Sequence, residues 1–388
     1  MKINRAIMTV FIAIGLILTL AEGSSIMADE TPVPELARWK AQMLQFGRLH
    51  GDRFVNGTYL TEDNAYYDGE RVYQQIAAYT GDPYFTTIAN YCEHFYRDDY
   101  VIPNNGNAQG YNNFTHGLAM DYLTTGDTQS KAAIILLATH MFGQDGLPPS
   151  ATASCDLSRE VAYVIAAYIN AERVGEARRD RLALMFEQAL GHLDQWFIAK
   201  SDPTFAPFMY ALTAEALIYY WDYVDQDPRI LDKLRMGADY IWDNCWLPAS
   251  EAFYYRKTNP AGAAPDLNLL IAPVYSWLYL QTHDTMYRDR GDQVFAGGVR
   301  RAYLEGNVGK TFNQNYRWSF DYLKWRKQAG LAGDTNGDGR VNVKDLIFIA
   351  TRFGVRQGDA AWDPRTDLNE NGIIDVVDLV TCARHLGE

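Results

Sequence analysis

The chain has 388 residues, and its 48 acidic against 35 basic residues give a formal net charge of −13 at pH 7. This excess of acids argues against sequence-independent DNA binding, which needs clustered Lys and Arg to neutralise phosphates. Hydrophobic residues make up 48% of the chain, which is enough for a sizeable core and excludes wholesale disorder. The 26 Tyr, 17 Phe and 9 Trp suit a carbohydrate groove, and they suit a plain helical core equally well.

The N-terminus has the pattern of an export signal. Lys2 and Arg5 form a basic start, residues 7–20 are an apolar run, and small residues follow up to Ala28. The run is shorter than the roughly 20 residues that cross a membrane as a helix, so a membrane anchor is the less favoured alternative. The sequence therefore predicts a signal peptide over residues 1–28. We expect a secreted mature chain without a membrane span, either free or held at a cell surface or in a cellulosome-like complex.

Turn signals divide residues 30–326 into helical hairpins. At residues 80–83 the order Thr-Gly-Asp-Pro supplies a glycine to end one helix, an N-cap for the next, and a proline for its first position. Similar junctions recur roughly every 50 residues, which leaves room for two helices in each interval, at residues 125–127, 175, 227–228 and 284. The pattern predicts an all-α fold, an (α/α) toroid of about six hairpins. An open helical solenoid is the alternative.

The four cysteines match no zinc-binding spacing; they are Cys92, Cys155, Cys245 and Cys382. An oxidising location would permit disulfides. Buried free thiols are at least as compatible with the wide spacing.

A short linker, residues 327–332, leads to a differently built region over residues 333–388. Residues 334–345 read DTNGDGRVNVKD and residues 367–378 read DLNENGIIDVVD. A calcium loop places oxygen ligands at positions 1, 3, 5, 7, 9 and 12 and a glycine at position 6, here Gly339 and Gly372. The predicted ligands, with backbone carbonyls at position 7, are Asp334, Asn336, Asp338, Arg340, Asn342 and Asp345, then Asp367, Asn369, Asn371, Ile373, Asp375 and Asp378. We expect two calcium ions there and no organic cofactor.

An apolar helix is expected after each loop, over residues 346–353 and 379–386. This duplicated loop–helix segment, about 55 residues long, resembles dockerin, the docking module of cellulosomal enzymes. The resemblance implies two structural calcium ions and a cohesin domain on a scaffold as the partner. Loop positions 10 and 11 are Val-Lys and Val-Val, not the small hydroxyl pair common in clostridial dockerins.

Dockerin-bearing chains are mostly polysaccharide-degrading enzymes, so the resemblance implies such chemistry in the large region. β-Elimination on a uronic acid needs a group that offsets the carboxylate charge, a base and an acid. In residues 111–121, YNNFTHGLAMD, a helix would place Asn113 and His116 on one face, with Asn112 beside them. Tyr and Arg occur together in two segments expected to be loops, residues 253–257 and 313–318.

This combination resembles the (α/α)-toroid polysaccharide lyases, including alginate and glucuronan lyases. The Asn-Asn-x-x-His segment is similar to the Asn-Asn-His of some alginate lyases, with two extra residues between. The resemblance implies that a Tyr transfers a proton while Asn, His or Arg steadies the carboxylate. The predicted catalytic residues are Asn113, His116, Tyr254 and Tyr316. The predicted substrate-binding residues are Asn112, Arg159, Arg256 and Arg317.

Two other functions remain open. A glycoside hydrolase on the same toroid would use two carboxylic acids, roughly 5–5.5 Å apart if retaining or 6.5–9.5 Å if inverting, from among Asp121, Asp156, Glu160 and Glu215. A non-catalytic carbohydrate-binding protein is the other alternative. Structural roles compete with the catalytic ones: His116, Tyr163 and Tyr168 in the core, Asp156 as a helix cap, and Glu160 paired with a neighbouring arginine.

Overall fold

The computed structural model describes residues 32–57, 66–142, 146–306, 309–329, 331, 333–336, 338, 340–369 and 371–387. The expected signal peptide, Gly339 and linker residues 330 and 332 lie outside this part. The chain divides into two compact units. The first contains residues 34–275 and 290–321, and the second contains residues 276–289 and 322–388 together with those before residue 34.

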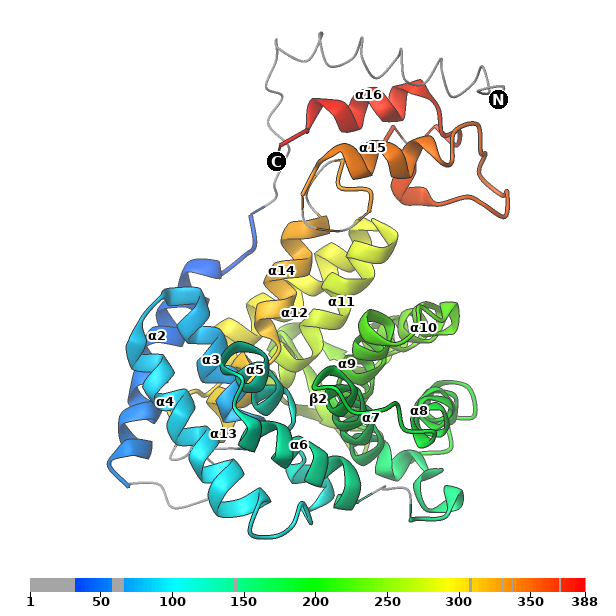
Figure 1. The fold of residues 1–388 in the computed structure, drawn as a ribbon. Coiled ribbons are helices and arrows are strands. Elements are labelled where there is room, and N and C mark those ends of the chain that lie inside the picture. Colours follow the sequence, from blue (N-terminus) through cyan, green and yellow to red (C-terminus); the bar gives the residue numbers. More distant parts are fainter. Residues whose placement is uncertain are drawn as a thin grey trace. The chain divides into compact units, whose positions relative to one another are not determined.

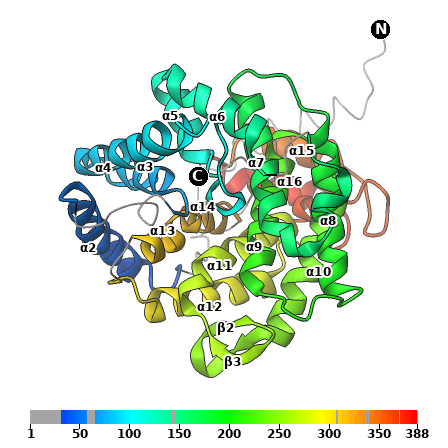
Figure 2. The same cartoon turned by 90° about the horizontal axis from the view of Figure 1, so that it is seen from below.

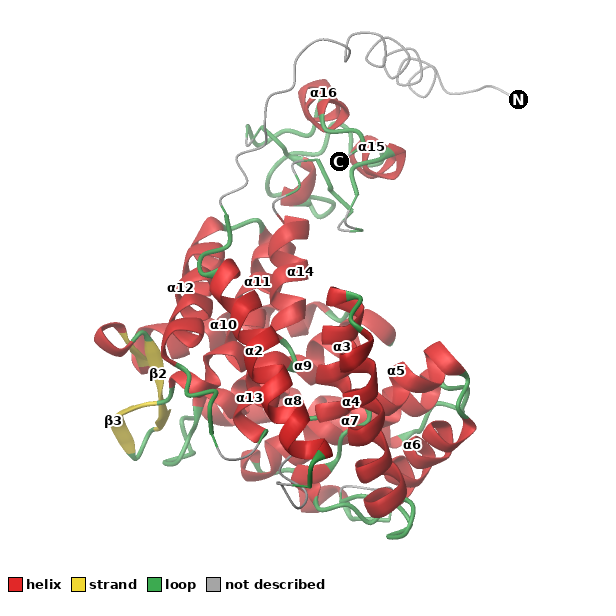
Figure 3. Cartoon of the chain, turned by 90° about the vertical axis from the view of Figure 1, so that its left-hand side faces the viewer, coloured by secondary structure: helices red, strands yellow, loops and turns green. Residues whose placement is uncertain are grey.

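Helices dominate the described residues, which confirms the all-α prediction (Figure 3). The helices of the first unit are α2 (Leu36–Val55), α3 (Gly69–Thr80), α4 (Pro83–Glu93), α5 (His116–Thr125), α6 (Thr128–His140), α7 (Ser158–Arg173), α8 (Arg181–Phe197), α9 (Pro207–Tyr223), α10 (Pro228–Cys245) and α13 (Lys310–Tyr316). Three more helices run through the boundaries between the units: α11 (Asn268–Thr282), α12 (Thr285–Arg301) and α14 (Ser319–Ala329).

Short elements connect these helices. They are the π-helical η1 (His94–Val101) and the 3-10 segments η2 (Gly110–Asn112), η3 (Pro149–Thr152), η4 (Cys155–Leu157), η5 (Pro248–Ser250) and η6 (Pro265–Leu267). A small antiparallel sheet has the order β1 (Trp246–Leu247), β2 (Ala252–Arg256) and β3 (Asn259–Ala263). In its register Trp246 pairs with Phe253, and Tyr254 with Ala263.

The junction signals act as predicted. Gly81 ends α3 with a φ of 69°, a left-handed conformation that costs glycine little. Asp82 then caps α4, because its side chain accepts a hydrogen bond from the Tyr84 backbone N–H at 3.0 Å. The side chains of Asp127 and Asp227 cap α6 and α10 in the same way. Local sequence therefore sets where these helices begin and end.

Within the first unit, the odd-numbered helices from α3 to α9 contact each other in sequence order. α3 contacts α5, α5 contacts α7, and α7 contacts α9, while α13 returns from much later in the chain to contact α3 (Figures 1 and 2). The even-numbered helices pack against this set as α3–α4, α5–α6, α7–α8 and α9–α10 pairs. α7 is buried throughout residues 161–171, a stretch of aliphatic and tyrosine side chains apart from Asn170.

Two segments that were expected to be loops are regular, so that expectation was wrong. Residues 252–256 form β2, where aromatic side chains favour an extended strand that pairs with β3. Lys310–Tyr316 form α13, in which Phe312 and Tyr316 lie four residues apart with ring centroids separated by 4.7 Å. Both rings are fully buried, and this packing outweighs the polar residues between them.

The second unit contains α15 (Val343–Ala350), η7 (Pro364–Thr366) and α16 (Val376–Arg384). α15 and α16 start three residues before the predicted helices, inside the two predicted calcium loops. A capping box explains each start: Asn342 with Asp345, and Asp375 with Asp378. A small core joins the two helices, made of Val341, Leu346, Ile349, Ile374, Leu379, Cys382 and Ala383.

Two further findings concern the whole described chain. All four cysteines are buried free thiols, so the disulfide alternative is not realised. Among the described helices, none combines the length and the apolar character that crossing a membrane requires.

Candidate functional site

A buried ionic core lies where three elements of the first unit meet. Glu215 on α9 accepts hydrogen bonds from Nη1 of Arg71 on α3 at 2.6 Å and from Nη2 of Arg317 at 2.7 Å. All three side chains are at most 7% exposed. Burial acts to raise the pKa of Glu215, but Arg317 and Arg71 outweigh it and hold that pKa below its ordinary value. Glu215 is therefore an ionised bridge between two guanidinium groups.

Tyrosines surround the Arg317 end of this core. Nη1 of Arg317 reaches the hydroxyl of Tyr163 at 3.5 Å, and its guanidinium lies 5.8 Å from the ring centroid of Tyr67. The buried Nε of Arg317 has no hydrogen-bond partner among the described residues. One donor of a buried, always charged group is thus unused.

His116, the first residue of α5, lies beside this core and is partly exposed. Its ring centroid is 4.7 Å from that of Tyr219 on α9. The Tyr219 hydroxyl donates to Oδ1 of Asn170 at 2.6 Å and accepts a short hydrogen bond from Nη1 of Arg173. α5, α7 and α9 thereby bring a histidine, a tyrosine and an arginine together.

Burial, reinforced by Arg71, Arg317 and Arg173, holds the pKa of His116 well below its usual range. The imidazole is therefore neutral at pH 7 and can accept a proton. Burial raises the pKa of Tyr219, so its hydroxyl keeps its proton. The two facing rings thus offer a proton acceptor and a proton donor.

A more exposed group adjoins the core. The guanidinium of Arg159 lies 5.5 Å from the ring centroid of Tyr111 and bonds Glu160 at 2.8 Å, as expected if Glu160 pairs with a neighbouring arginine. Nζ of Lys310 lies 4.7 Å from the ring centroid of Tyr66. Burial raises the pKa of Tyr66, while Arg159 and Arg317 both lie near enough to oppose that rise. The outer group and the buried core therefore meet at Tyr66.

The two predicted asparagines do not share a helix with His116, so that expectation was wrong. α5 begins at His116 with Thr115 as its N-cap, and Asn113 is extended at φ −97° and ψ 92°. Nδ2 of Asn113 contacts Sδ of Met141, while its buried carbonyl oxygen has no partner among the described residues. The backbone carbonyl of Asn112 accepts a hydrogen bond from Tyr96 at 2.6 Å.

Three other predicted residues have contacts elsewhere. Tyr254 on β2 is 6% exposed, and its hydroxyl accepts from Sγ of Cys245 at 3.1 Å. Arg256 lies over the neighbouring Tyr255, 5.0 Å from its ring centroid. Tyr316 is fully buried, and its hydroxyl donates to the Trp39 carbonyl at 3.0 Å. Of the predicted catalytic and substrate-binding residues, His116 and Arg317 lie in or beside the buried core, and Arg159 lies in the more exposed group that adjoins it.

Asp156 does not cap α7, so that interpretation was wrong. Its carboxylate accepts a hydrogen bond from Oγ of Ser154 at 3.0 Å, within a 3-10 turn that precedes the helix. The N-cap of α7 is Leu157, whose side chain makes no capping hydrogen bond.

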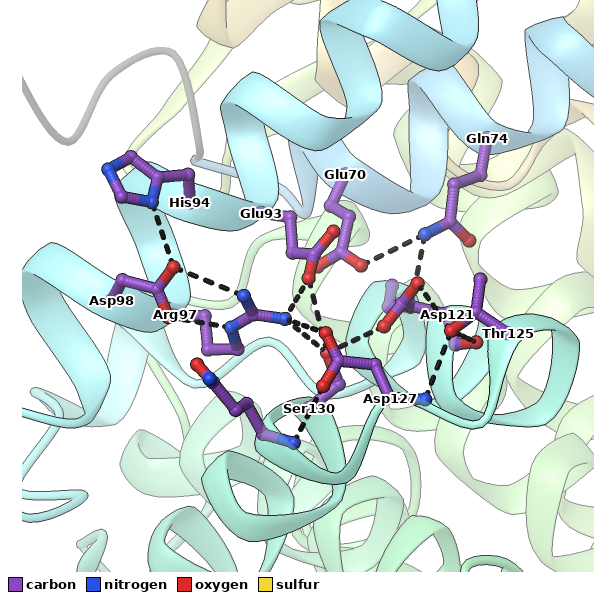
Figure 4. A network of polar contacts seen from close by, with 12 residues as sticks. Glu70, Gln74, Glu93, His94, Arg97, Asp98, Asp121, Thr125, Asp127 and Ser130 are labelled. Atoms are coloured by element: carbon purple, nitrogen blue, oxygen red, sulfur yellow. Dashed lines mark hydrogen bonds and ion pairs between the residues drawn. The ribbon is translucent and has the colours of Figure 1, made fainter.

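Asp121 belongs to a second ionic network, which contains more carboxylates than cations (Figure 4). Arg97 bonds Glu93, Asp98 and Asp127. A pocket of about 460 Å³ is lined by these residues and by Asp121. Possible ligand oxygens of Glu93, Asp121 and Asp127 lie within 4.8 Å of one another. Because the Arg97 guanidinium already bonds two of these three acids, we infer no metal site there.

The two predicted calcium loops have matching geometry. In the first, Asp334 and Asn336 accept from the backbone N–H of Asp338, at 3.1 and 2.9 Å. In the second, the equivalent acceptors Asp367 and Asn369 lie 3.1 and 3.0 Å from the N–H of Asn371. The final aspartates, Asp345 and Asp378, are completely buried. The donor set consists of carboxylate, amide and carbonyl oxygens, which is the chemistry that calcium prefers.

We call the residues around His116 and Glu215 the His116 cluster. It includes Asp321, whose carboxylate accepts a hydrogen bond from Nη2 of Arg71 at 3.2 Å. Sequence reasoning missed several of its members: Tyr67, Arg71, Asn170, Arg173, Tyr219 and Asp321. One signal was available. Glu215 stands in the otherwise apolar run of α9, and a buried carboxylate requires a cationic partner. The sequence could not show which arginine supplies it, since Arg71 is 144 residues away.

Comparisons with known proteins found no relative. No family model, no curated protein and no solved structure matches the chain.

Proposed function

We propose that the protein is a secreted polysaccharide lyase that cleaves a uronic-acid polymer by β-elimination. The observation that carries this proposal is the contact between a neutral, partly exposed His116 and the protonated Tyr219 beside three arginines. An (α/α) toroid would supply the frame. The successive α3–α5–α7–α9 contacts and the return of α13 to α3 support that architecture.

The reaction assigns a distinct step to each group. Neutral His116 removes the proton from C5 of the uronate. The electron pair forms the C4–C5 double bond and expels the glycosidic oxygen from C4. The Tyr219 hydroxyl gives its proton to that oxygen, and exchange with water then restores His116 and Tyr219. No redox partner is needed, because β-elimination involves no net oxidation or reduction. The product carries one unsaturated uronate for each bond broken.

Arginine charge would bind the substrate carboxylate and stabilise the negative charge that develops beside C5. Arg173 is the strongest candidate, because its hydrogen-bond partners are the neutral side chains of Asn170 and Tyr219. Arg317 adds the unused Nε donor. Arg159, next to the exposed ring of Tyr111, and Lys310, next to the partly exposed ring of Tyr66, would contact a neighbouring sugar.

Hydrolysis is less well supported for the acids that the sequence singled out near His116. A hydrolase needs one carboxylic acid that keeps its proton near neutral pH. Glu215 has a lowered pKa and bonds to an arginine through each oxygen, so it cannot be that acid. Glu160 pairs with Arg159, and Asp156 is exposed next to Ser154. Measured turnover would separate either enzyme from a non-catalytic binding protein.

We further propose that residues 333–388, which belong to the second unit, form a dockerin-like module that binds two calcium ions and docks onto a cohesin-bearing scaffold. The repeated loop geometry and the all-oxygen donor set support calcium. Docking rests on the sequence resemblance alone.

The test of the proposed chemistry compares His116→Gln with the wild type, using ultraviolet absorbance of the unsaturated uronate. Loss of a general base costs about 10²- to 10⁴-fold in rate. Tyr254→Phe is the control, because it removes the hydroxyl of a tyrosine whose contacts lie elsewhere. We expect His116→Gln to lose activity and Tyr254→Phe to keep it. Equal losses in the two variants would contradict the assignment.

A further inference from the structure

One buried carboxylate joins the two helices that carry Arg71 and His116. Oδ1 of Asp68 accepts a hydrogen bond from the backbone N–H of Arg71 in the first turn of α3, at 3.2 Å. Oδ2 of the same carboxylate accepts one from the backbone N–H of Gly117 in the first turn of α5, also at 3.2 Å. First-turn N–H groups have no acceptor within their own helix, so Asp68 satisfies one in each of two helices.

Asp68 holds its carboxylate in this position with a strained backbone conformation. Tyr67 and Asp68 both have left-handed backbones, with φ values of 60° and 62°. Such conformations are unfavourable for residues other than glycine and persist where surrounding contacts hold them. Asp68 is 4% exposed, so neither of its hydrogen bonds competes with bulk water.

The approach of the two helices also depends on a missing side chain. A Cβ built on Gly117 would lie 2.6 Å from Oδ1 of Asp68 and 2.8 Å from the backbone nitrogen of Arg71. Both distances are too short for real contacts. Any other residue at 117 would push α5 away from Asp68, and His116 would move with it.

We propose that Asp68 is the positioning residue of the site: it fixes the start of α5, and thus the His116 ring, relative to Arg71. The importance of this positioning for catalysis rests on the proposed function. The positioning itself is independent of that function. The groups that face His116 come from several elements. They are Arg71 on α3, Arg173 on α7, Tyr219 on α9 and Arg317 after α13. A shift of α5 changes the distance from His116 to all of them at once.

The first test uses the unaltered full chain and needs no substrate. Hydrogen exchange followed by NMR should show the Gly117 amide protected to the level of amides in the middle of α5. Without an acceptor, an amide in a first turn exchanges readily. Fast exchange at Gly117 in the folded protein would overturn the proposal.

The second test follows the His116 ring by NMR titration in two variants. Asp68→Asn leaves one acceptor oxygen and turns an amide NH₂ toward one of the two N–H groups. Gly117→Ala keeps the carboxylate but forces the helices apart. Both should move the His116 titration toward that of an ordinary histidine, by about one pKa unit or more as the ring becomes better solvated. If Asp68→Asn does not fold, Gly117→Ala and the exchange measurement decide.

Matched controls separate positioning from general loosening. Gly191→Ala makes the same change in α8, where an added Cβ meets nothing within 4 Å. Asp284→Asn alters another helix cap, which accepts from the Met286 N–H at 2.9 Å. Neither control should move the His116 titration. An unchanged His116 titration in folded Asp68→Asn and Gly117→Ala would refute the positioning role.

The activity arm keeps this inference separable from the proposed function. Misplacing a base by about 1 Å costs on the order of 10²-fold in rate, so both variants should lose kcat while KM changes little. If uronate polymers are not cleaved by the wild type but the titration shifts occur, the proposed function fails and the positioning role stands. Equal activity in the wild type and in variants with a displaced His116 would exclude a catalytic purpose for the positioning.

Discussion

The first unit contains two ionic networks with opposite balances. In the His116 cluster two buried arginines, Arg71 and Arg317, share the carboxylate of Glu215, and Arg71 also bonds Asp321 at 3.2 Å. In the network of Figure 4 a single guanidinium, that of Arg97, is shared by Glu93, Asp98 and Asp127. One side chain links the others in each network: Glu215 in the first and Arg97 in the second. Each network should depend most strongly on that side chain. In the second network three acids surround one guanidinium, so we expect it to repel an anionic ligand.

The largest expected effect is the loss of the shared carboxylate in the His116 cluster. Glu215→Gln leaves the buried Arg317 without the carboxylate that it bonds and leaves Arg71 with Asp321 alone, which should cost about 3–5 kcal/mol of unfolding free energy. Glu93→Gln should cost much less, since Arg97 keeps Asp98 and Asp127. Urea denaturation of both variants measures the difference. Equal losses would break the comparison.

The reverse substitution tests the acidic network. Arg97→Gln removes the guanidinium that bonds Glu93, Asp98 and Asp127, and about 3 kcal/mol should be lost at neutral pH. The pKa of Glu93 is raised by burial while Arg97 opposes the rise, so without Arg97 it rises further. Folding then favours the protonated acid. The deficit should therefore shrink as pH falls through the folded pKa toward 4.5, and a deficit independent of pH would contradict this account.

Calcium removal should lower the stability of the second unit and leave both ionic networks of the first unit unchanged. The buried aspartates of the second unit bond backbone N–H groups of the same loops, and two bound ions would add stability to that unit alone. At a free calcium concentration 100 times Kd, each ion contributes about 2.7 kcal/mol. Differential scanning calorimetry with chelator should show one transition shifted down, and Asp345→Ala should lose part of that shift. Identical traces with calcium and chelator would refute calcium binding.

The smallest expected effect concerns acid stability. Burial and the three arginines hold the pKa of His116 below 6.5, so folding favours its neutral form. That stabilisation is complete above pH 6.5 and is lost as pH falls from 6.5 toward the folded pKa. His116→Gln should flatten this part of the stability profile. A wild-type profile that His116→Gln leaves unchanged would mean that the histidine is solvated like an ordinary one.

Interactions between residues close in sequence could be predicted, whereas interactions between distant residues could not. The caps at Asp82 and Asp127 act within two residues, and they were predicted correctly. The capping boxes of α15 and α16 are equally local. Glu215 meets Arg317 across 102 residues, and only the tertiary fold creates that pair.

The misplaced residues have similar physical causes. Asn113 was assigned to a helix because its spacing from His116 fits one turn, yet Asp68 satisfies the first turn of α5 from outside and the helix starts later. Tyr316 and Arg317 are neighbours in sequence, but they leave the end of α13 in different directions. Tyr316 contacts Trp39 in the core, whereas Arg317 bonds Glu215. Side-chain direction of this kind is decided by tertiary packing.

The most direct test of the central claim is the ultraviolet absorbance of the purified chain acting on a panel of uronic-acid polymers, with reducing ends counted in the same samples. β-Elimination forms a conjugated unsaturated uronate with every bond it breaks, whereas hydrolysis forms none. The account predicts that absorbance and reducing ends rise together on at least one polyuronate, and that neither rises with His116→Gln. New reducing ends without absorbance would contradict the lyase assignment and establish a hydrolase in its place.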